Sequence, residues 1–123
     1  MRLLVVDDEL DTAQMIALLL SNAGHEVSYA ITAKAALDLA ASHRPDVIIL
    51  DLRLPDMDGI DLARQLKAMD GVRQARIIAI TGRMTDAEGR ALEAGCERFL
   101  RKPLSPELLD AIIREGAAPA STA

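Results

Sequence analysis

Several features that many binding sites require are missing from this chain. A single cysteine, Cys96, excludes an internal disulfide and a structural zinc site, and it favours a reducing compartment. There is no tryptophan, and Tyr29 and Phe99 are the only other aromatic residues, which argues against a flavin site or a base-stacking nucleic-acid surface. Acidic residues outnumber basic ones by 19 to 14 and no basic stripe is present, so we expect no direct nucleic-acid binding.

Long apolar runs are missing as well. The sequence turns acidic at Asp7, which is too early for a signal peptide, and no apolar run is long enough to span a bilayer. We therefore expect no targeting segment, no membrane association and a cytoplasmic location. The length of 123 residues fits one domain with one hydrophobic core.

Short aliphatic runs alternate with stretches of helical spacing. Runs of this kind, rich in Val and Ile and bounded by turn residues, are typical of strands buried on both faces. The alternation predicts an α/β fold, in which parallel strands are joined by right-handed crossovers and helices cover both faces of the sheet. The expected strands are residues 3–6, 27–30, 47–50, 77–80 and 99–100.

Capping residues indicate where the helices begin and end. Thr32 and Ser105 are predicted N-caps, Asp58-Gly59 precedes the third helix, and Gly95 is a predicted C-cap after a helix that starts near Thr85 or Asp86. The first helix is expected to bury one apolar stripe, formed by Leu10, Ala13, Ile16, Ala17 and Leu20.

Polar side chains directly follow four of the five predicted strands. Because ligands of open α/β sheets bind beyond the carboxyl ends of the strands, we expect these side chains to converge on one site. They are Asp7-Asp8-Glu9 after the first strand, Asp51 after the third, Thr81-Gly82 after the fourth and Arg101-Lys102-Pro103 after the fifth.

The charges of this predicted site favour a divalent cation. Asp7, Asp8 and Asp51 repel one another, and Lys102 offsets only part of their charge. Carboxylate oxygens are hard ligands that suit Mg²⁺. With the metal and Lys102 neutralising a phosphoryl group, Asp51 can act as a nucleophile and form an aspartyl-phosphate. Taken singly, such an Asp is often only a turn or cap residue, and we expect Asp8 to cap the first helix as well.

Five motifs in order are similar to those of a known family. From Leu3 to about Glu115 the chain resembles the receiver domain of two-component response regulators. The resemblance implies a flavodoxin-like fold, with a five-stranded parallel sheet in the order 2-1-3-4-5 flanked by five helices. It implies a receiver domain over residues 1–115, and the small-residue composition of residues 116–123 predicts a flexible tail or linker there. The motifs are Val5-Val6-Asp7-Asp8-Glu9, the segment from Asp46 to Gly59, Ile80-Thr81-Gly82, Ala94-Gly95 and Phe99-Leu-Arg-Lys102-Pro103.

The resemblance implies a role for each matching residue. Asp51 resembles the phosphoacceptor. Asp8, Asp51 and the backbone carbonyl of Arg53 would bind Mg²⁺ directly, and Asp7 would bind it through water. Thr81 would hydrogen-bond the phosphoryl group, and Lys102 would pair with it. Phe99 matches the aromatic residue whose rotamer follows the state of Thr81, and the Lys102–Pro103 peptide bond would be cis.

The function implied is a phosphorylation-dependent switch that catalyses its own phosphoryl uptake and slow loss. The donor would be a histidine kinase or a histidine phosphotransfer protein, and the chain would be a stand-alone regulator or a part of a hybrid kinase or larger regulator. The resemblance also allows a phosphorylation-dependent dimer through the face made by the fourth helix, the fifth strand and the fifth helix.

The same residues also allow two alternative functions and leave one question open. A phosphohydrolase of the aspartate-nucleophile type usually has a second aspartate two residues after the nucleophile, where this chain has Arg53. A degenerate receiver that only binds proteins is disfavoured by the complete set of acids, Thr81 and Lys102. Arg53 and Arg83 flank the expected path of the attacking water, where they could either shield the phosphoryl group or hold the water.

Overall fold

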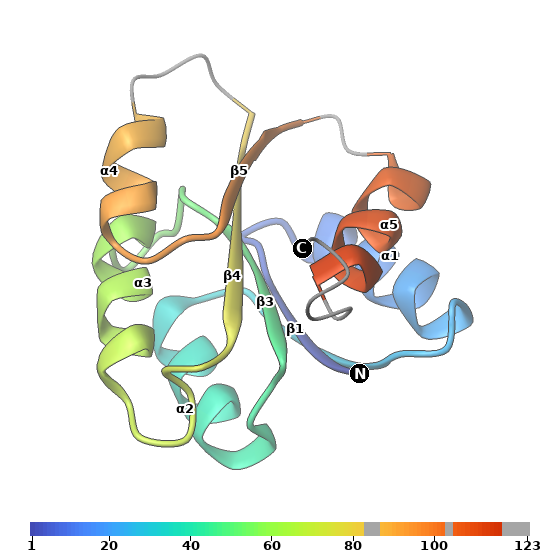
Figure 1. Cartoon of the computed structure of the whole chain (residues 1–123), viewed down its shortest axis with the longest axis horizontal. Helices are drawn as coiled ribbons and strands as arrows, with labels where there is room; N and C mark the ends of the chain where they lie inside the picture. Colours follow the sequence, from blue (N-terminus) through green and yellow to red (C-terminus); the bar gives the residue numbers. More distant parts are fainter. Residues whose placement is uncertain (83–86, 103–104, 117–123) are drawn as a thin grey trace.

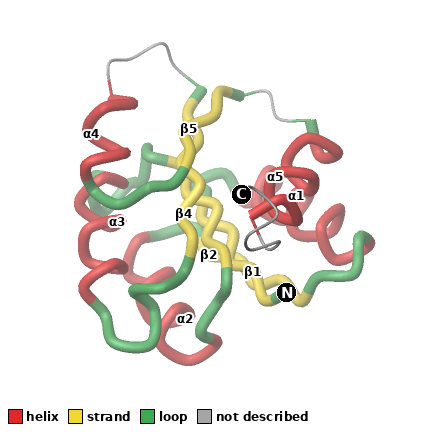
Figure 2. The backbone as a smooth tube through the Cα atoms, viewed as in Figure 1, coloured by secondary structure: helices red, strands yellow, loops and turns green. Residues whose placement is uncertain are grey.

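The computed structural model describes residues 1–82, 87–102 and 105–116. Within these ranges, five strands alternate with five helices and form one parallel sheet in the order β2-β1-β3-β4-β5 (Figures 1 and 2). The predicted fold class and strand order are therefore confirmed. In chain order the elements are β1 (Arg2–Val6), α1 (Leu10–Asn22), β2 (Glu26–Ala30), α2 (Ala33–His43), β3 (Val47–Asp51), α3 (Gly59–Ala68), β4 (Arg76–Thr81), α4 (Ala87–Glu93), β5 (Arg98–Arg101) and α5 (Pro106–Gly116).

The helices cover the sheet on both sides. Helices α1 and α5 lie on one side and α2, α3 and α4 on the other (Figure 1). Side chains alternate along each strand, so β3 contributes Val47 and Ile49 to the cluster under α1 and α5. Ile48 and Leu50 belong to the cluster under the other three helices. The core is therefore two apolar layers separated by the sheet.

The two edge strands differ from the expectation that every strand is buried on both faces. β1, β3 and β4 are almost wholly buried, whereas most residues of β2 and β5 are only half-buried or exposed. An edge strand has a neighbour on one side only, so its short apolar run is shielded less than a central run of the same composition. The prediction of full burial is wrong for β2 and β5.

Side-chain caps are found at three helix starts, and they confirm the caps predicted at Thr32 and Ser105. In each case a side-chain oxygen accepts a backbone N–H of the first turn, which satisfies a donor that the helix itself cannot pair. The pairs are Thr32 with the amide of Ala35 at 3.1 Å, Asp58 with that of Ile60 at 2.8 Å, and Ser105 with that of Leu108 at 3.2 Å.

The boundaries of α4 and α5 bear on two further expectations. Gly95 has a φ of +105°, which suits a glycine directly after a helix. The expected start of α4 at Thr85 or Asp86 lies outside the described residues, as do residues 117–123. The division into a domain and a tail at residue 116 stays a prediction.

Helix α1 corrects two predictions. It begins at Leu10 without a cap from Asp8; instead, Asp7 Oδ1 accepts the backbone N–H of Glu9 at 2.9 Å. Leu10 itself is 45% exposed, while Ala13, Ile16, Ala17 and Leu20 are buried as expected. Leu10 is the first residue of α1, and helical spacing alone does not ensure that a residue at the end of a helix is buried.

Arg76, the first residue of β4, connects three elements at the amino edge of the sheet. Its Nε donates to both carboxylate oxygens of Glu97, at 2.9 and 3.0 Å. Its terminal nitrogens donate to the carbonyls of Ile113 at 2.8 Å and Ile112 at 3.1 Å, in the last turns of α5. One guanidinium therefore joins β4, the residue before β5 and the C-terminal end of α5.

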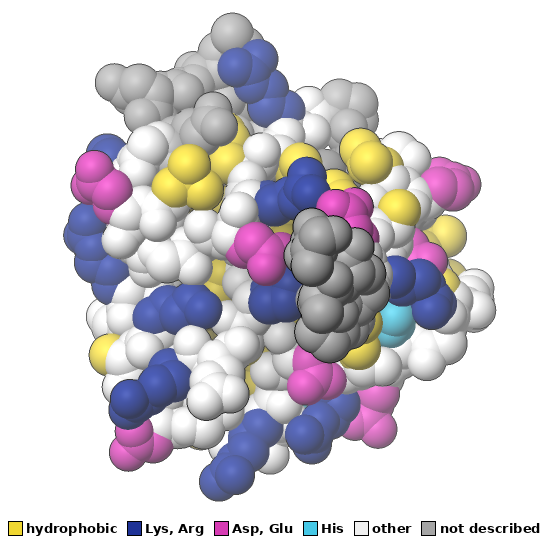
Figure 3. All heavy atoms as spheres, viewed as in Figure 1, with side chains coloured by type: hydrophobic (Ala, Val, Ile, Leu, Met, Phe, Trp, Pro, Cys, Tyr) yellow, Lys and Arg dark blue, Asp and Glu magenta, His cyan; other side chains and the backbone are white. Residues whose placement is uncertain are grey.

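The surface shows acidic and basic side chains interspersed over the face seen in Figure 3. Among residues 1–82, 87–102 and 105–116, every helix falls short of the length and apolar character that a bilayer span requires.

Candidate functional site

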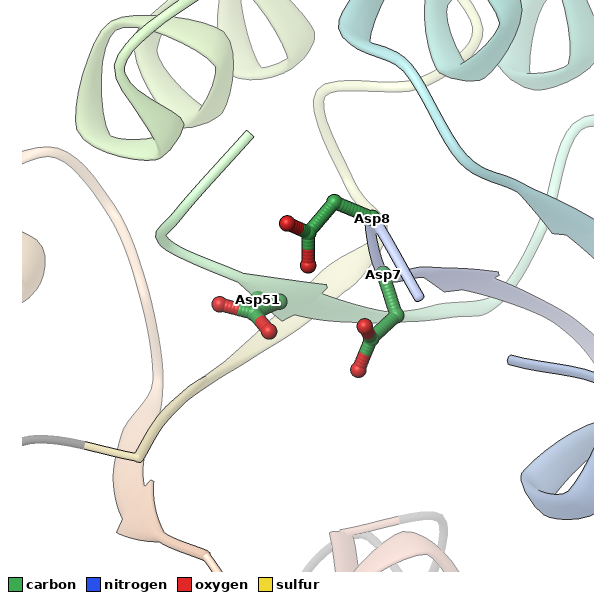
Figure 4. A group of neighbouring side chains, drawn as sticks. All are labelled: Asp7, Asp8 and Asp51. Carbon is green, nitrogen blue, oxygen red and sulfur yellow. The ribbon is translucent and has the colours of Figure 1, made fainter. Parts of the chain in front are cut away.

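Three carboxylates meet at the carboxyl edge of the sheet. Asp7 and Asp8 follow β1, and Asp51 is the last residue of its neighbour β3, so the pairing of Val6 with Leu50 brings the acids side by side. One carboxylate oxygen from each of the three lies within 4.8 Å of the other two (Figure 4). Asp7 and Asp51 are buried, whereas Asp8 is exposed. The convergence follows from parallel pairing, which places the ends of adjacent strands together.

Each buried carboxylate is oriented by a backbone amide two residues later in the chain. Asp7 Oδ1 accepts the N–H of Glu9 at 2.9 Å, and Asp51 Oδ1 accepts the N–H of Arg53 at 2.8 Å. Such bonds are common for Asp at the start of a turn. They leave the second oxygen of each acid free of its own loop and directed to a cation.

Lys102 is that cation in the present structure. Its ammonium lies 2.8 Å from Asp51 Oδ2 and 2.9 Å from Asp7 Oδ2. The backbone N–H of Lys102 donates to the carbonyl of Thr81 at 2.8 Å, which holds the residue just beyond the β4–β5 pairing. Three carboxylates face one ammonium, so the site carries an excess of two negative charges.

The pKa shifts of Asp51 and Lys102 reflect this excess of negative charge. Burial raises the pKa of Asp51, and the charge of Asp7 adds to the rise; the hydrogen bonds from Lys102 and Arg53 oppose it without cancelling it. Burial alone would lower the pKa of Lys102, but the hydrogen bonds and charges of Asp51 and Asp7 outweigh that effect and raise it. Lys102 therefore stays charged at neutral pH. Its single positive charge does not fully compensate the negative charges of Asp51 and Asp7.

Thr81 and Phe99 lie on the same face of the sheet. Thr81 is buried at the end of β4, and Phe99 is half-buried in β5 opposite Ala79. Residues two apart in a strand share a face, so Phe99 lies diagonally beside Thr81, on the side covered by α2, α3 and α4.

The predicted site residues are thus brought together where the structure describes them. Asp7, Asp8, Asp51 and Lys102 form one cluster, with Thr81 next to Lys102 through the backbone. Pro103 and Arg83 lie outside the described residues, so the cis peptide bond and the effect of Arg83 stay predictions.

Sequence reasoning missed several long-range polar contacts, among them those made by Asp56 and Asp110. Asp56 accepts the backbone N–H groups of Ala33 and Lys34 at the start of α2, at 2.8 and 3.2 Å. The buried ring of His25 contacts Asp110 of α5, with 2.8 Å between Nε2 and Oδ1. Both acids look like ordinary surface residues in the sequence, and only the packing of separate elements brings their partners within reach.

The sequence model of the response regulator receiver domain matches residues 3–114, which is nearly the whole chain. The chain belongs to the response regulator receiver domain family. The resemblance seen in the sequence is therefore confirmed.

Relatives and solved structures agree with this receiver domain over most of its length. The polar-differentiation response regulator DivK of Brucella anthropi is 35% identical over 112 residues, which are 89% of this chain and 90% of DivK. The sensory/regulatory protein RpfC of Xanthomonas campestris is 36% identical over 99% of this chain, which spans only 18% of RpfC. A two-component response regulator from Clostridium difficile superposes with a TM-score of 0.90 at 26% identity, over 98% of both chains.

Proposed function

We propose that this receiver domain accepts a phosphoryl group on Asp51, with Mg²⁺ held at the same edge of the sheet, and changes conformation in response. The observation that supports the proposal most directly is the cluster of Asp7, Asp8 and Asp51 within 4.8 Å, with Lys102 in contact with two of the three. A nucleophile, a set of metal ligands and a cation for the phosphoryl group are then all within one site.

The proposed reaction is a transfer from a phosphohistidine. An oxygen of Asp51 attacks the phosphorus, the new P–O bond forms as the P–N bond breaks, and the histidine nitrogen leaves with the electron pair and takes up a proton. Burial prepares Asp51 for this role, because the ionised carboxylate is poorly solvated and gains from reacting. Lys102 already contacts Asp51 Oδ2 and would transfer that contact to a phosphoryl oxygen.

The residues present fit Mg²⁺. Asp7, Asp8, Asp51 and the backbone carbonyl of Arg53 would hold the ion, and hard oxygen ligands are the donor class that Mg²⁺ prefers. The two excess negative charges match one divalent cation. When bound, the ion supplies positive charge to the transferring phosphoryl group.

Thr81 and Phe99 would convert phosphorylation into a change of shape. A phosphoryl group adds about 1.5 to 2 negative charges, and the hydroxyl of Thr81, at the end of β4, would donate a hydrogen bond to it. If Thr81 moves toward Asp51, space opens beside it on the face that Phe99 shares. The surface of α4, β5 and α5 would then change, and it is the surface that we propose for a phosphorylation-dependent dimer.

The partners follow from the chemistry of the site. We propose a histidine kinase or a histidine phosphotransfer protein in the cytoplasm as the donor. DivK, which this chain nearly covers, and RpfC, of which it covers a small part, represent the two settings that we propose, a stand-alone regulator and a part of a larger protein.

Acetyl phosphate with Mg²⁺, followed by intact mass measurement, tests the proposed function. Wild type should gain one phosphoryl group, and Asp51→Asn, which keeps the volume of the side chain, should gain none. Glu97→Gln at the opposite edge of the sheet is the matched control and should react like wild type. Equal uptake by wild type and Asp51→Asn would exclude Asp51 as the acceptor. No uptake by wild type would favour a protein-binding module, and continuous release of phosphate would favour a phosphohydrolase.

A further inference from the structure

The loop between β3 and α3 is tied to a helix more than twenty residues away. Asp56, in this loop, accepts the backbone N–H of Ala33 at Oδ1 (2.8 Å) and that of Lys34 at Oδ2 (3.2 Å). These amides belong to the first turn of α2, where N–H groups have no partner within the helix and a carboxylate is favoured by the helix dipole. The same bonds lower the pKa of Asp56, so the tie is intact at neutral pH.

The other end of this loop enters the proposed phosphorylation site. Arg53 donates its backbone N–H to Asp51 Oδ1 at 2.8 Å and forms an isolated antiparallel bridge with Asp58. The base of the loop is closed where Gly59 donates to the carbonyl of Leu52 at 3.1 Å. A Cβ at Gly59 would lie 2.5 Å from Leu52 Cα, so only glycine allows this closure.

We propose that Asp56 is a positioning residue for the metal site: its tie to the start of α2 holds the β3–α3 loop so that the backbone of Arg53 stays in place to bind Mg²⁺. The proposal rests on the proposed function, in which the Arg53 carbonyl is a metal ligand. Arg53 and Asp56 are three residues apart, and the short closed loop transmits the restraint from one to the other.

The physical basis is preorganisation. A backbone carbonyl in a loose loop must be ordered each time the ion binds, and the lost conformational entropy weakens binding. A loop that is already held at its base by Gly59 and at its tip by Asp56 loses this entropy on folding, before the ion binds. Partners that orient a metal ligand in this way commonly change metal affinity by one to two orders of magnitude.

Thr32 offers a matched control for Asp56. Its side chain accepts the N–H of Ala35 at 3.1 Å, so it caps the same turn of α2 but has no bond to the β3–α3 loop. Asp56→Ala and Thr32→Ala each remove a cap from α2, and each should lower the thermal midpoint of the metal-free protein by about 4 °C. Only Asp56→Ala also releases the loop.

The decisive measurement is a titration of the full chain with MgCl₂, followed by backbone amide NMR shifts. Asp56→Ala should raise the Mg²⁺ dissociation constant about tenfold, whereas Thr32→Ala should stay within about twofold of wild type. Asp56→Asn keeps one acceptor oxygen and should fall between wild type and Asp56→Ala. Equal weakening in both alanine variants, or wild-type affinity in Asp56→Ala, would overturn the proposal.

A metal-free measurement separates this proposal from the proposed function. In EDTA, hydrogen exchange of the Arg53 amide should be about tenfold faster in Asp56→Ala and unchanged in Thr32→Ala. Unchanged exchange in Asp56→Ala would refute the positioning role. If wild type showed no Mg²⁺ binding that depends on Asp8, the proposed metal site would be wrong, and the exchange of Arg53 would still decide whether Asp56 holds the loop.

Discussion

The two edges of the sheet each bury most of one cationic side chain, and the two cations have different surroundings. At the amino edge, the Arg76 side chain is 18% exposed and pairs with one carboxylate, that of Glu97, and with two carbonyls of α5. At the carboxyl edge, the Lys102 side chain is 23% exposed and pairs with Asp7 and Asp51, with Asp8 nearby. The Arg76–Glu97 pair is balanced in charge, whereas Lys102 lies among three acids.

This difference distinguishes the structural ion pair of Arg76 and Glu97 from the proposed functional site. The guanidinium of Arg76 pairs with one carboxylate and two carbonyls at the end of α5, so these groups need no further ligand. Their hydrogen bonds stabilise the fold. An ammonium shared between two buried acids leaves negative charge uncompensated, which costs stability and favours binding of a further cation. Four predictions test this contrast, in order of decreasing effect.

The largest effect is expected when Arg76 is removed. Arg76→Met should lower the free energy of unfolding by about 3 kcal/mol, because Glu97 and two carbonyls of α5 lose their partner. Urea unfolding measures the loss. Phosphorylation by acetyl phosphate should persist in the folded fraction, and its abolition would contradict the separation of the two edges.

Magnesium should stabilise the protein through the carboxyl edge alone. At a Mg²⁺ concentration one hundred times the dissociation constant, binding to the folded state adds about 2.7 kcal/mol and raises the thermal midpoint. Asp8→Ala should lose this rise, because Asp8 is one of the three clustered acids. Glu97→Gln should keep it, and a similar loss in both variants would show that the effect is not local to the site.

In the absence of metal, neutralising one acid should change the free energy of unfolding in opposite directions at the two edges. Asp51→Asn should leave the free energy of unfolding unchanged or raise it, since repulsion from Asp7 and the burial of charge are both relieved. Glu97→Gln should lower it by about 1 kcal/mol, because a charge-assisted bond to Arg76 is weakened. Chemical denaturation in EDTA compares them, and equal signs would refute the contrast.

The smallest effect is a dependence on pH at the amino edge. The hydrogen bonds from Arg76 hold the pKa of Glu97 below its ordinary value of 4.5. A lowered pKa in the folded state contributes stability that is complete above pH 4.5 and is lost as the pH falls through the lower, folded value. The difference in unfolding free energy between wild type and Glu97→Gln should therefore shrink from pH 7 to pH 3. A constant difference would show that Glu97 is not stabilised as an anion.

The sequence by itself determined the order of the elements, most of the caps and the acids of the site. Thr32, Asp58 and Ser105 cap through bonds to amides two or three residues away, so the information is local. Asp7, Asp8 and Asp51 follow buried parallel strands, and parallel pairing requires their ends to meet. Capping bonds and the residues at strand ends can be predicted because each depends on a short stretch of sequence.

Tertiary structure decided the polar contacts between separate segments, both at the candidate site and away from it. The contacts of Lys102 with Asp7 and Asp51, the bonds of Asp56 to α2 and the five hydrogen bonds of Arg76 to Glu97 and the end of α5 all join segments at least 20 residues apart. The exposure of Leu10 and of the edge strands was likewise set by position in the fold. Periodicity shows which face of an element is apolar, but the reach of one side chain to another depends on how the elements pack.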